Sequence, residues 1–369
     1  MKLRLPFRYL EPAFFAGLLD DPLLFVRIRP LRRALLFDCG QIAHLSKRVV
    51  KPIDTVFITH AHMDHVMGIP TLVRHHHVSP RPLDIFGPPG IAERIDHQLR
   101  GYDWNLSEPG WVTIRVHEIR PEHILHYSFS GPHGFACRFE REEPRTGREI
   151  WSCPYAVVEA ELLDHRLPVL AFRLTEKEAF AIDPDRLERL GLMPGEWIAE
   201  LKKRVWKHRP QAEGSAPAGT MPASYEGGGN HTALYESIRK KRPAASLGYL
   251  CDVGRTPDNV AKIEGLLRDV TLLCADCTFL AEDEDRARVS YHLCTGDLNH
   301  LSGILRPCYL LPMHLSKSYL RRTEDIYREL APPPDTTVLR LPAHIVPPPL
   351  TVEDVKGWLT VDHQTADRP

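Results

Sequence analysis

Residues 59–68 read Thr-His-Ala-His-Met-Asp-His-Val-Met-Gly, and no other stretch says as much about this chain. Its ionisable side chains are His60, His62, Asp64 and His65. They follow the apolar, β-branched run Val56–Ile58, which predicts a buried strand. Imidazole and carboxylate groups are the usual ligands of zinc and similar metals. We therefore expect a metal-binding turn at the end of this strand.

The density of this loop predicts more than one ion. A catalytic zinc ion has three protein ligands and keeps one position open. Four candidate ligands in one loop exceed that number, so the pattern indicates two adjacent ions. The alternative is a histidine-rich surface turn. It is disfavoured because turns favour Gly, Asn, Pro and Ser over ionisable residues that leave a core strand.

Composition places the chain among soluble globular proteins. It has 369 residues, 43% hydrophobic and 26% charged, with a formal net charge of −1. A nucleic-acid partner would therefore need a local positive patch. No apolar run approaches the roughly 18 residues of a membrane span, and the N-terminal residues lack the apolar region of a secretory signal. The eight cysteines are scattered, so we expect a reducing, cytoplasmic location.

Strand-like and helical segments alternate along the chain. Leu23–Ile28 and Arg33–Phe37 are predicted strands, and Val66–Arg74 and Ile91–Leu99 are predicted helices. Strands dominate the core and helices lie between them. This pattern predicts an α/β fold with two sheets covered by helices.

Three more candidate ligands each follow a predicted strand. His165 follows the apolar stretch Tyr155–Leu163, Asp252 follows Ala245–Leu250, and His314 follows Cys308–Pro312. A histidine after a strand is by itself a weak signal of metal binding. In combination with the 59–68 loop, the three residues predict one shared site at the strand ends.

These motifs resemble the metallo-β-lactamase fold and, within it, the ribonuclease Z family, endonucleases that trim the 3′ end of precursor tRNA. Residues 60–65 are similar to the His-x-His-x-Asp-His signature of the fold. The likeness runs in order from about residue 20 to residue 330. The other matching stretches are Leu36–Gly40, Ile85–Gly90, Leu163–Arg173, Asp252–Asn259 and Met313–Tyr319.

The resemblance implies an αββα sandwich of two mixed sheets flanked by helices, and a centre of two zinc ions. One ion would be held by His60, His62 and His165, and the other by Asp64, His65 and His314. Asp252 would bridge the ions together with a hydroxide, and Asp38 would hydrogen-bond the ligand loop. Manganese or iron could take the place of zinc.

The resemblance also implies catalytic roles. Asp64 would orient the attacking hydroxide or accept its proton. His292 would act as the general acid that protonates the leaving 3′-oxygen, and Asp276 would orient it. The alternative for His292 is a helix-capping or surface histidine.

Three departures from the family pattern concern the substrate. Met63 stands where the family has glycine, and Asp276 where it has glutamate. Glu196 follows Gly195 where the family's tRNA-clamping arm has a Gly-Pro pair. We expect residues 1–331 to form the catalytic domain, with an arm-like or lid-like insertion at about 184–230 that includes a linker over 211–230. Residues 332–369, which contain two proline triplets, are expected to be an appendage.

The leading hypothesis is a dinuclear zinc phosphodiesterase that cleaves RNA, with precursor tRNA 3′ ends as one substrate. Its partners would be RNA or a small phosphodiester, with no membrane, and the resemblance implies a homodimer. One rival is a thioesterase or lactonase of the same fold, for which the Asp276–His292 pair is not needed. A second rival is a non-catalytic RNA-binding scaffold, against which the full ligand set argues.

Overall fold

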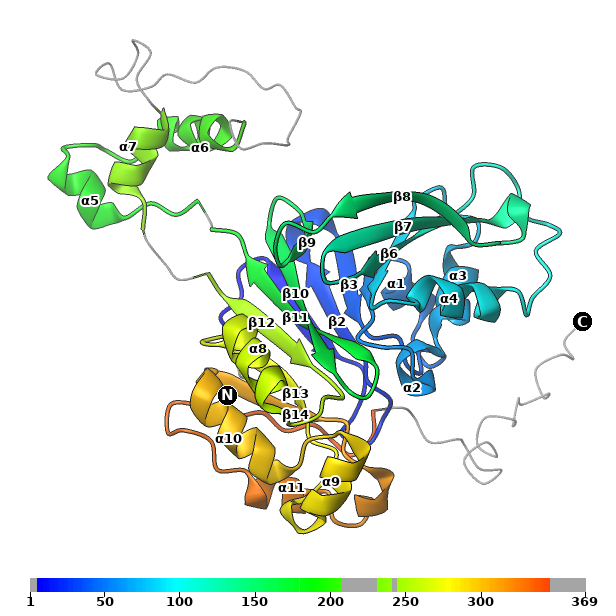
Figure 1. Ribbon diagram of the computed structural model, residues 1–369. Coiled ribbons are helices and arrows are strands. Elements are labelled where there is room, and N and C mark those ends of the chain that lie inside the picture. Colours follow the sequence, from blue (N-terminus) through cyan, green and yellow to red (C-terminus); the bar gives the residue numbers. More distant parts are fainter. Residues whose placement is uncertain (1–4, 179, 208–230, 241–243, 346–369) are drawn as a thin grey trace, which may run out of the picture.

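Two β-sheets pack face to face, and helices cover the outer face of each sheet (Figure 1). This computed structural model describes residues 5–178, 180–207, 231–240 and 244–345. The arrangement is the expected αββα sandwich with two mixed sheets. The prediction of the fold class is therefore confirmed.

The first sheet has eight strands that lie in chain order, β1 to β8. Pairs from β3 to β6 are parallel, and the outer pairs are antiparallel. The strands are β1 (Leu10–Phe14), β2 (Leu24–Ile28), β3 (Arg33–Phe37), β4 (Ile53–Phe57), β5 (Leu83–Gly87), β6 (Thr113–Ile119), β7 (His123–Ser130) and β8 (Arg138–Pro144).

The second sheet has seven strands in the order β15-β14-β13-β12-β11-β10-β9. Its parallel half runs from β12 to β15, and its antiparallel half from β9 to β12. The strands are β9 (Glu149–Ser152), β10 (Ala156–Asp164), β11 (Pro168–Glu176), β12 (Ser246–Leu250), β13 (Leu272–Asp276), β14 (Tyr309–Met313) and β15 (Thr337–Val338).

Helices α3 and α4 lie against the first sheet, and α8 and α10 against the second (Figure 1). None of the helices within the described ranges is long and apolar enough to cross a membrane. The helices are α1 (Lys47–Val50), α2 (Met63–Val66), α3 (Ile69–His76), α4 (Ile91–Leu99), α5 (Pro184–Arg189), α6 (Trp197–Lys207), α7 (His231–Ile238), α8 (Pro257–Leu267), α9 (Glu284–Ser290), α10 (Thr295–Leu305) and α11 (Glu324–Glu329).

An aromatic layer joins the two sheets. The ring of Phe37 lies 5.0 Å from that of Phe57, 5.7 Å from Phe172 and 5.6 Å from Tyr249, measured between centroids. All four side chains are fully buried. Burying one such side chain stabilises the fold by about 1.5–3 kcal/mol. This layer fixes the two sheets against each other and so fixes the loops at their ends.

The local predictions hold for regular segments and shift where the chain bends. The predicted strand Arg33–Phe37 and helix Ile91–Leu99 are observed with the same bounds. The single helix expected over Val66–Arg74 is instead two helices, α2 and α3. Pro70 at the start of α3 explains the break, because proline is tolerated only in the first turn of a helix.

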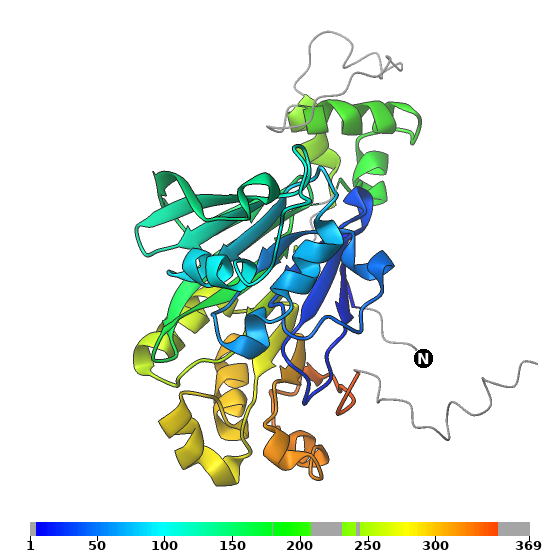
Figure 2. The ribbon, with the colours of Figure 1, turned by 90° about the vertical axis from the view of Figure 1, so that its right-hand side faces the viewer.

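The insertion at about 184–230 forms a separate group of helices in its described part. Helices α5, α6 and α7 pack on one another through Leu187, Leu201 and Leu234. Figures 1 and 2 show them standing clear of both sheets, at the end far from α2. The linker expected over 211–230 lies outside the described residues.

Part of the expected appendage joins the sandwich. Strand β15 pairs with β14 in parallel and extends the second sheet. Leu341 and Ala343 pack on the core beneath that sheet. Residues 346–369 lie outside the described part of the chain, and the domain boundary at residue 331 stays a prediction.

Candidate metal centre

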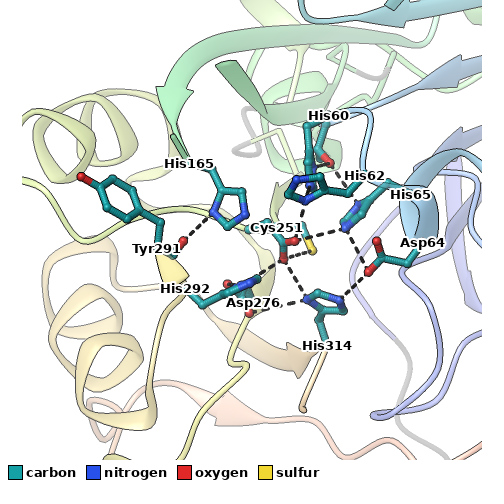
Figure 3. A network of polar contacts seen from close by, with 12 residues as sticks. His60, His62, Asp64, His65, His165, Cys251, Asp276, Tyr291, His292 and His314 are labelled. Atoms are coloured by element: carbon teal, nitrogen blue, oxygen red, sulfur yellow. Dashed lines mark hydrogen bonds and ion pairs between the residues drawn. The ribbon is translucent and has the colours of Figure 1, made fainter. Parts of the chain in front are cut away.

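The candidate ligands meet at one end of the sandwich. Those of the 59–68 loop follow β4, His165 lies in the turn between β10 and β11, Asp252 follows β12, and His314 follows β14. The carboxyl ends of β12, β13 and β14 meet at the same sheet edge because these strands are parallel. Figure 3 shows the side chains directed toward one another from both sheets.

A helical turn, rather than an irregular loop, carries two of the ligands. Strand β4 ends at Phe57, and Asp64 and His65 lie in the first turn of α2. The backbone N–H of Thr59 leaves the sheet ladder and donates to Asp38 Oδ1 at 2.7 Å. This bond explains why the strand ends before Thr59.

The ligand atoms form overlapping groups whose members lie within 4.8 Å of one another. Asp252 belongs to two of these groups and so links the two halves of the centre. The groups around the centre are His60 with His62, His165 and Asp252; Asp64 with His65 and His314; and Asp252 with Asp276, His292 and His314. The first two have the same histidines and aspartates as the two ligand sets that the resemblance implies.

Asp38 holds the ligand loop from below. Its carboxylate is fully buried and accepts from the Thr59 hydroxyl at 3.0 Å, His65 Nδ1 at 2.9 Å and the Tyr249 hydroxyl at 3.0 Å. Because Asp38 accepts from Nδ1 of His65, Nε2 of that ring faces the centre. Metal-binding histidines commonly have a carboxylate partner of this kind on their other ring nitrogen. The expected hydrogen bonding of Asp38 to the ligand loop is confirmed.

Backbone strain is concentrated around the centre. Several non-glycine residues there have positive φ: Asp38 (55°), Arg166 (59°), Asp252 (49°), Tyr291 (58°) and His314 (61°). Such conformations cost about 1–3 kcal/mol each and persist only where the surroundings enforce them. The clustering indicates that side-chain placement here outweighs local backbone preference.

The electrostatics of the centre favour a positive charge between the carboxylates. Burial alone lowers the pKa of His65, but the carboxylates of Asp38 and Asp252 outweigh burial and raise it to about 10. Asp252 likewise outweighs burial and raises the pKa of His314 well above its usual value. On the other side, burial and the neighbouring His65 lower the pKa of His60 to about 2. His60 is therefore neutral and able to offer a lone pair to a metal.

The donor set fits borderline metal ions. Nε2 of His65 and Nδ1 of His314 are buried and make no hydrogen bond to the described residues. They lie 3.3 and 2.8 Å from Asp252 oxygens, but the atoms are not aligned as hydrogen bonds. Buried polar atoms are normally paired. Orphaned imidazole nitrogens beside carboxylates are what a zinc, manganese or iron ion would bind.

His292 and Asp276 lie at the edge of this cluster. Nδ1 of His292 is 3.5 Å from Asp276 Oδ2 and 3.5 Å from Asp252 Oδ1. The hydroxyl of Thr278 lies 2.6 Å from Asp276 Oδ1 and 3.1 Å from the same imidazole nitrogen, so it bridges the two. Burial opposes the charged imidazole, but Asp252 and Asp276 raise the pKa of His292 to about 10.

Two contacts of this site were absent from the sequence analysis. The carbonyl of Tyr291 accepts from His165 Nδ1 at 2.6 Å, so the backbone next to His292 orients a candidate ligand. The hydroxyl of Thr278 bridges Asp276 and His292. Thr278 lies only two residues after Asp276, so its contact with that side chain could have been inferred from the sequence. No local pattern indicates that residues 165 and 291 are in contact.

The centre opens to solvent beside the ligand loop. His62 and Met63 are exposed, Met63 by 73%, and Asp64 is partly exposed. His60, His65 and Asp252 lie beneath them and are buried. Met63, which departs from the family pattern, therefore stands at the rim rather than among the candidate ligands.

Comparison with known proteins gives a family match, similar curated proteins and similar solved structures. Residues 33–139 match the family model of the beta-lactamase superfamily domain. Ribonuclease Z of Deinococcus radiodurans is 30% identical over 294 residues, which cover 77% of this chain and 83% of that protein. Ribonuclease Z of Shouchella clausii is 27% identical over 304 residues, with 80% of each chain covered. The solved structure of human tRNase Z, short form, is 16% identical with a TM-score of 0.47, over 89% of this chain and 96% of that one.

Proposed function

Because the chain belongs to the ribonuclease Z family of the metallo-β-lactamase superfamily, we propose that it is a dinuclear zinc phosphodiesterase that cleaves RNA. The observation that carries the proposal is the convergence of seven candidate ligands from four separate stretches. They lie in two groups that share Asp252 through its contacts with His60 and His314. Such a pair of groups is suited to two ions rather than one.

The chain's own residues would divide the work as follows. His60, His62 and His165 would hold one ion, Asp64, His65 and His314 the other, and Asp252 both. When bound, such ions supply Lewis acidity and lower the pKa of a coordinated water toward neutrality. Asp64, partly exposed and 3.1 Å from His314 Nε2, would orient the attacking water or accept its proton.

Departure of the 3′-oxygen needs a proton, and we propose that His292 delivers it. Its Nδ1 faces Asp276 and Thr278, which leaves Nε2 as the atom available to a substrate. Asp276 and Asp252 favour the protonated ring. A general acid of this kind contributes about 10²–10⁴-fold to the rate. This pair favours a phosphodiester with a poor leaving group over a thioester or lactone.

The placement of α5–α7 supports a large substrate. Strand β11 leads from the turn of His165 to the base of this helical group, and its nine residues span about 26 Å. If α5–α7 formed a lid over the metal centre of their own chain, they would have to fold back over the length of β11. Lys202 and Lys203 are exposed on α6 and could contact a phosphate backbone. We therefore propose an outward arm that binds RNA, with precursor tRNA as the first substrate to test.

The experiment compares substrates and variants of the full-length protein. Precursor tRNA, bis(p-nitrophenyl) phosphate and a thioester are incubated with and without chelator. We expect chelator-sensitive cleavage of both phosphodiesters, and its loss in His314→Ala. His300→Ala, an exposed histidine on α10, is the matched control. Thioester hydrolysis without phosphodiester cleavage would refute the proposal.

A further inference from the structure

A short C-terminal segment is bound to a loop that packs behind the metal centre, beside the residue after His314 and beside Gly40. The two parts are the strap, residues 342–345, and the buttress loop, residues 17–22. Backbone N–H groups of Leu18 and Leu19 donate to the carbonyls of Pro342 and Ala343, each at 2.9 Å. Figure 2 shows the orange-red end of the described chain beside the blue N-terminal region.

Asp20 fastens the strap to the loop. Its carboxylate accepts from the Gly17 and Ile345 backbone N–H groups, both at 2.7 Å, and lies 2.7 Å from His344 Nδ1. The Asp20 side chain is only 8% exposed, although His344 is half exposed. Loss of the carboxylate would leave the two backbone donors without this acceptor and would loosen the strap from the loop.

The buttress loop in turn supports the backbone beside His314. The N–H of Leu315 donates to the carbonyl of Leu18 at 2.9 Å. Leu18, Leu19 and Leu315 are buried in one core cluster, on which Ala343 also packs. Because His314 itself has a φ of 61°, its conformation depends on such surrounding contacts.

The same loop packs on Gly40, which also contacts the backbone of Asp64. Gly40 is enclosed by the carbonyl of Asp64, the Cβ of Asp21 and the carbonyl of Pro22, so closely that no Cβ could be accommodated there. The loop therefore accepts a hydrogen bond from the residue after His314 and packs on the glycine that Asp64 also contacts. His314 and Asp64 are two of the three ligands proposed for one ion.

We propose that Asp20 is a positioning residue for the ion held by Asp64, His65 and His314, and that the strap sets this half of the metal centre through the buttress loop. The inference rests on the proposed function, because it takes these three residues as ligands. It also gives a role to residues 342–345, whose contribution the sequence left open.

Gly17 offers a perturbation that changes no charge. A Cβ at this position would lie 2.7 Å from the Ala343 carbonyl oxygen and 2.7 Å from His344 Cα, so Gly17→Ala must displace the strap. Gly147→Ala is the matched control, because a Cβ there meets nothing within 4 Å. Glu324→Ala is a control for Asp20→Ala, since it also removes a carboxylate. Glu324 forms an exposed ion pair with Arg340, which lies two residues before the strap.

The test is a zinc titration of the full-length protein against a competing chromophoric chelator. Wild type should show two binding steps, and His314→Ala identifies the step that belongs to the supported ion. Changes behind a metal ligand typically cost about 10–100-fold in affinity. We expect that loss in this step for Asp20→Ala and Gly17→Ala, with the other step unchanged and both controls like wild type.

The outcomes separate the two proposals. A wild-type protein that binds no zinc would overturn the proposed function and this inference with it. Two wild-type steps that Gly17→Ala and Asp20→Ala leave unaltered would overturn the inference alone. Equal weakening of both steps would also overturn it, because that result indicates general damage to the fold. Gly17→Ala decides the matter if Asp20→Ala does not fold.

Discussion

Replacement of Tyr249 by phenylalanine should weaken the support beneath the metal centre without altering its shape. Tyr249 is fully buried between the sheets, and its hydroxyl donates to Asp38 Oδ2 at 3.0 Å. The substitution removes one oxygen atom and one of the donors to a buried carboxylate. The bonds from Thr59 and His65 to Asp38 remain.

The size of the effect follows from the charge of Asp38. A hydrogen bond to a charged group contributes about 1.5–3 kcal/mol, because the buried charge cannot recover the lost bond from water. A phenylalanine ring fills the same space, so no cavity adds to this value. We therefore expect the free energy of unfolding to fall by about 2 kcal/mol in Tyr249→Phe.

Urea unfolding of the metal-free protein, followed by circular dichroism, measures this difference. Tyr327→Phe is a matched control, since the Tyr327 hydroxyl bonds the N–H and carbonyl of Leu341, which are uncharged backbone groups. Its cost should be about 0.5–1.5 kcal/mol. Equal stability of Tyr249→Phe and wild type would refute the argument, because Asp38 would then not be a charged group that depends on its donors.

Three further predictions concern catalysis, stability and pH. His292→Ala should slow RNA cleavage by about 10²–10⁴-fold, but slow bis(p-nitrophenyl) phosphate hydrolysis far less, because p-nitrophenolate leaves without a proton; equal losses in steady-state assays would contradict this. Asp297→Ala should lower the free energy of unfolding in urea by about 1–3 kcal/mol, because the buried carboxylate accepts from the Cys294 backbone N–H at 3.1 Å and pairs with Arg288 at 2.6 Å; a stability equal to that of wild type would contradict this. Burial lowers the pKa of His76 below 6.5, so the unfolded chain binds more protons and stability falls as pH drops below about 6.5. His76→Gln should reduce this fall in stability. The same change of urea midpoint from pH 7 to pH 5 in the variant and in wild type would refute this prediction.

Features that depend on local sequence were predictable. His165, Asp252 and His314 each follow a strand, and parallel strands present their carboxyl ends at one edge, so their convergence could be inferred. The helix Ile91–Leu99 carries its own apolar spacing and was predicted with its observed bounds. In these cases the pattern and the tertiary structure favour the same conformation.

Features that depend on distant contacts were not predictable from the chain alone. Tyr249 and Asp38 are 211 residues apart, and His165 and the Tyr291 carbonyl are 126 apart. In both pairs, the sequence around one residue does not indicate the other. Strand β1 was also missed, because Pro12 interrupts it and proline in a strand is compatible only with an edge.

The short strand β15 shows the same limit. Thr337 and Val338 are only two residues among prolines, too few for a recognisable period. They become a strand because Leu310 and Tyr309 of β14 offer free backbone partners at the sheet edge. The strap is a similar case, because its bonds to residues 17–22 join parts of the chain more than 300 residues apart.

Metal content of the full-length protein tests the central claim most directly. Mass spectrometry of the purified protein, after removal of loosely bound ions, should find about two zinc, manganese or iron ions per folded chain. His314→Ala should retain fewer, and His300→Ala the same number as wild type. A folded protein that holds no such ion when supplied with all three metals would contradict the assignment of these seven residues as ligands.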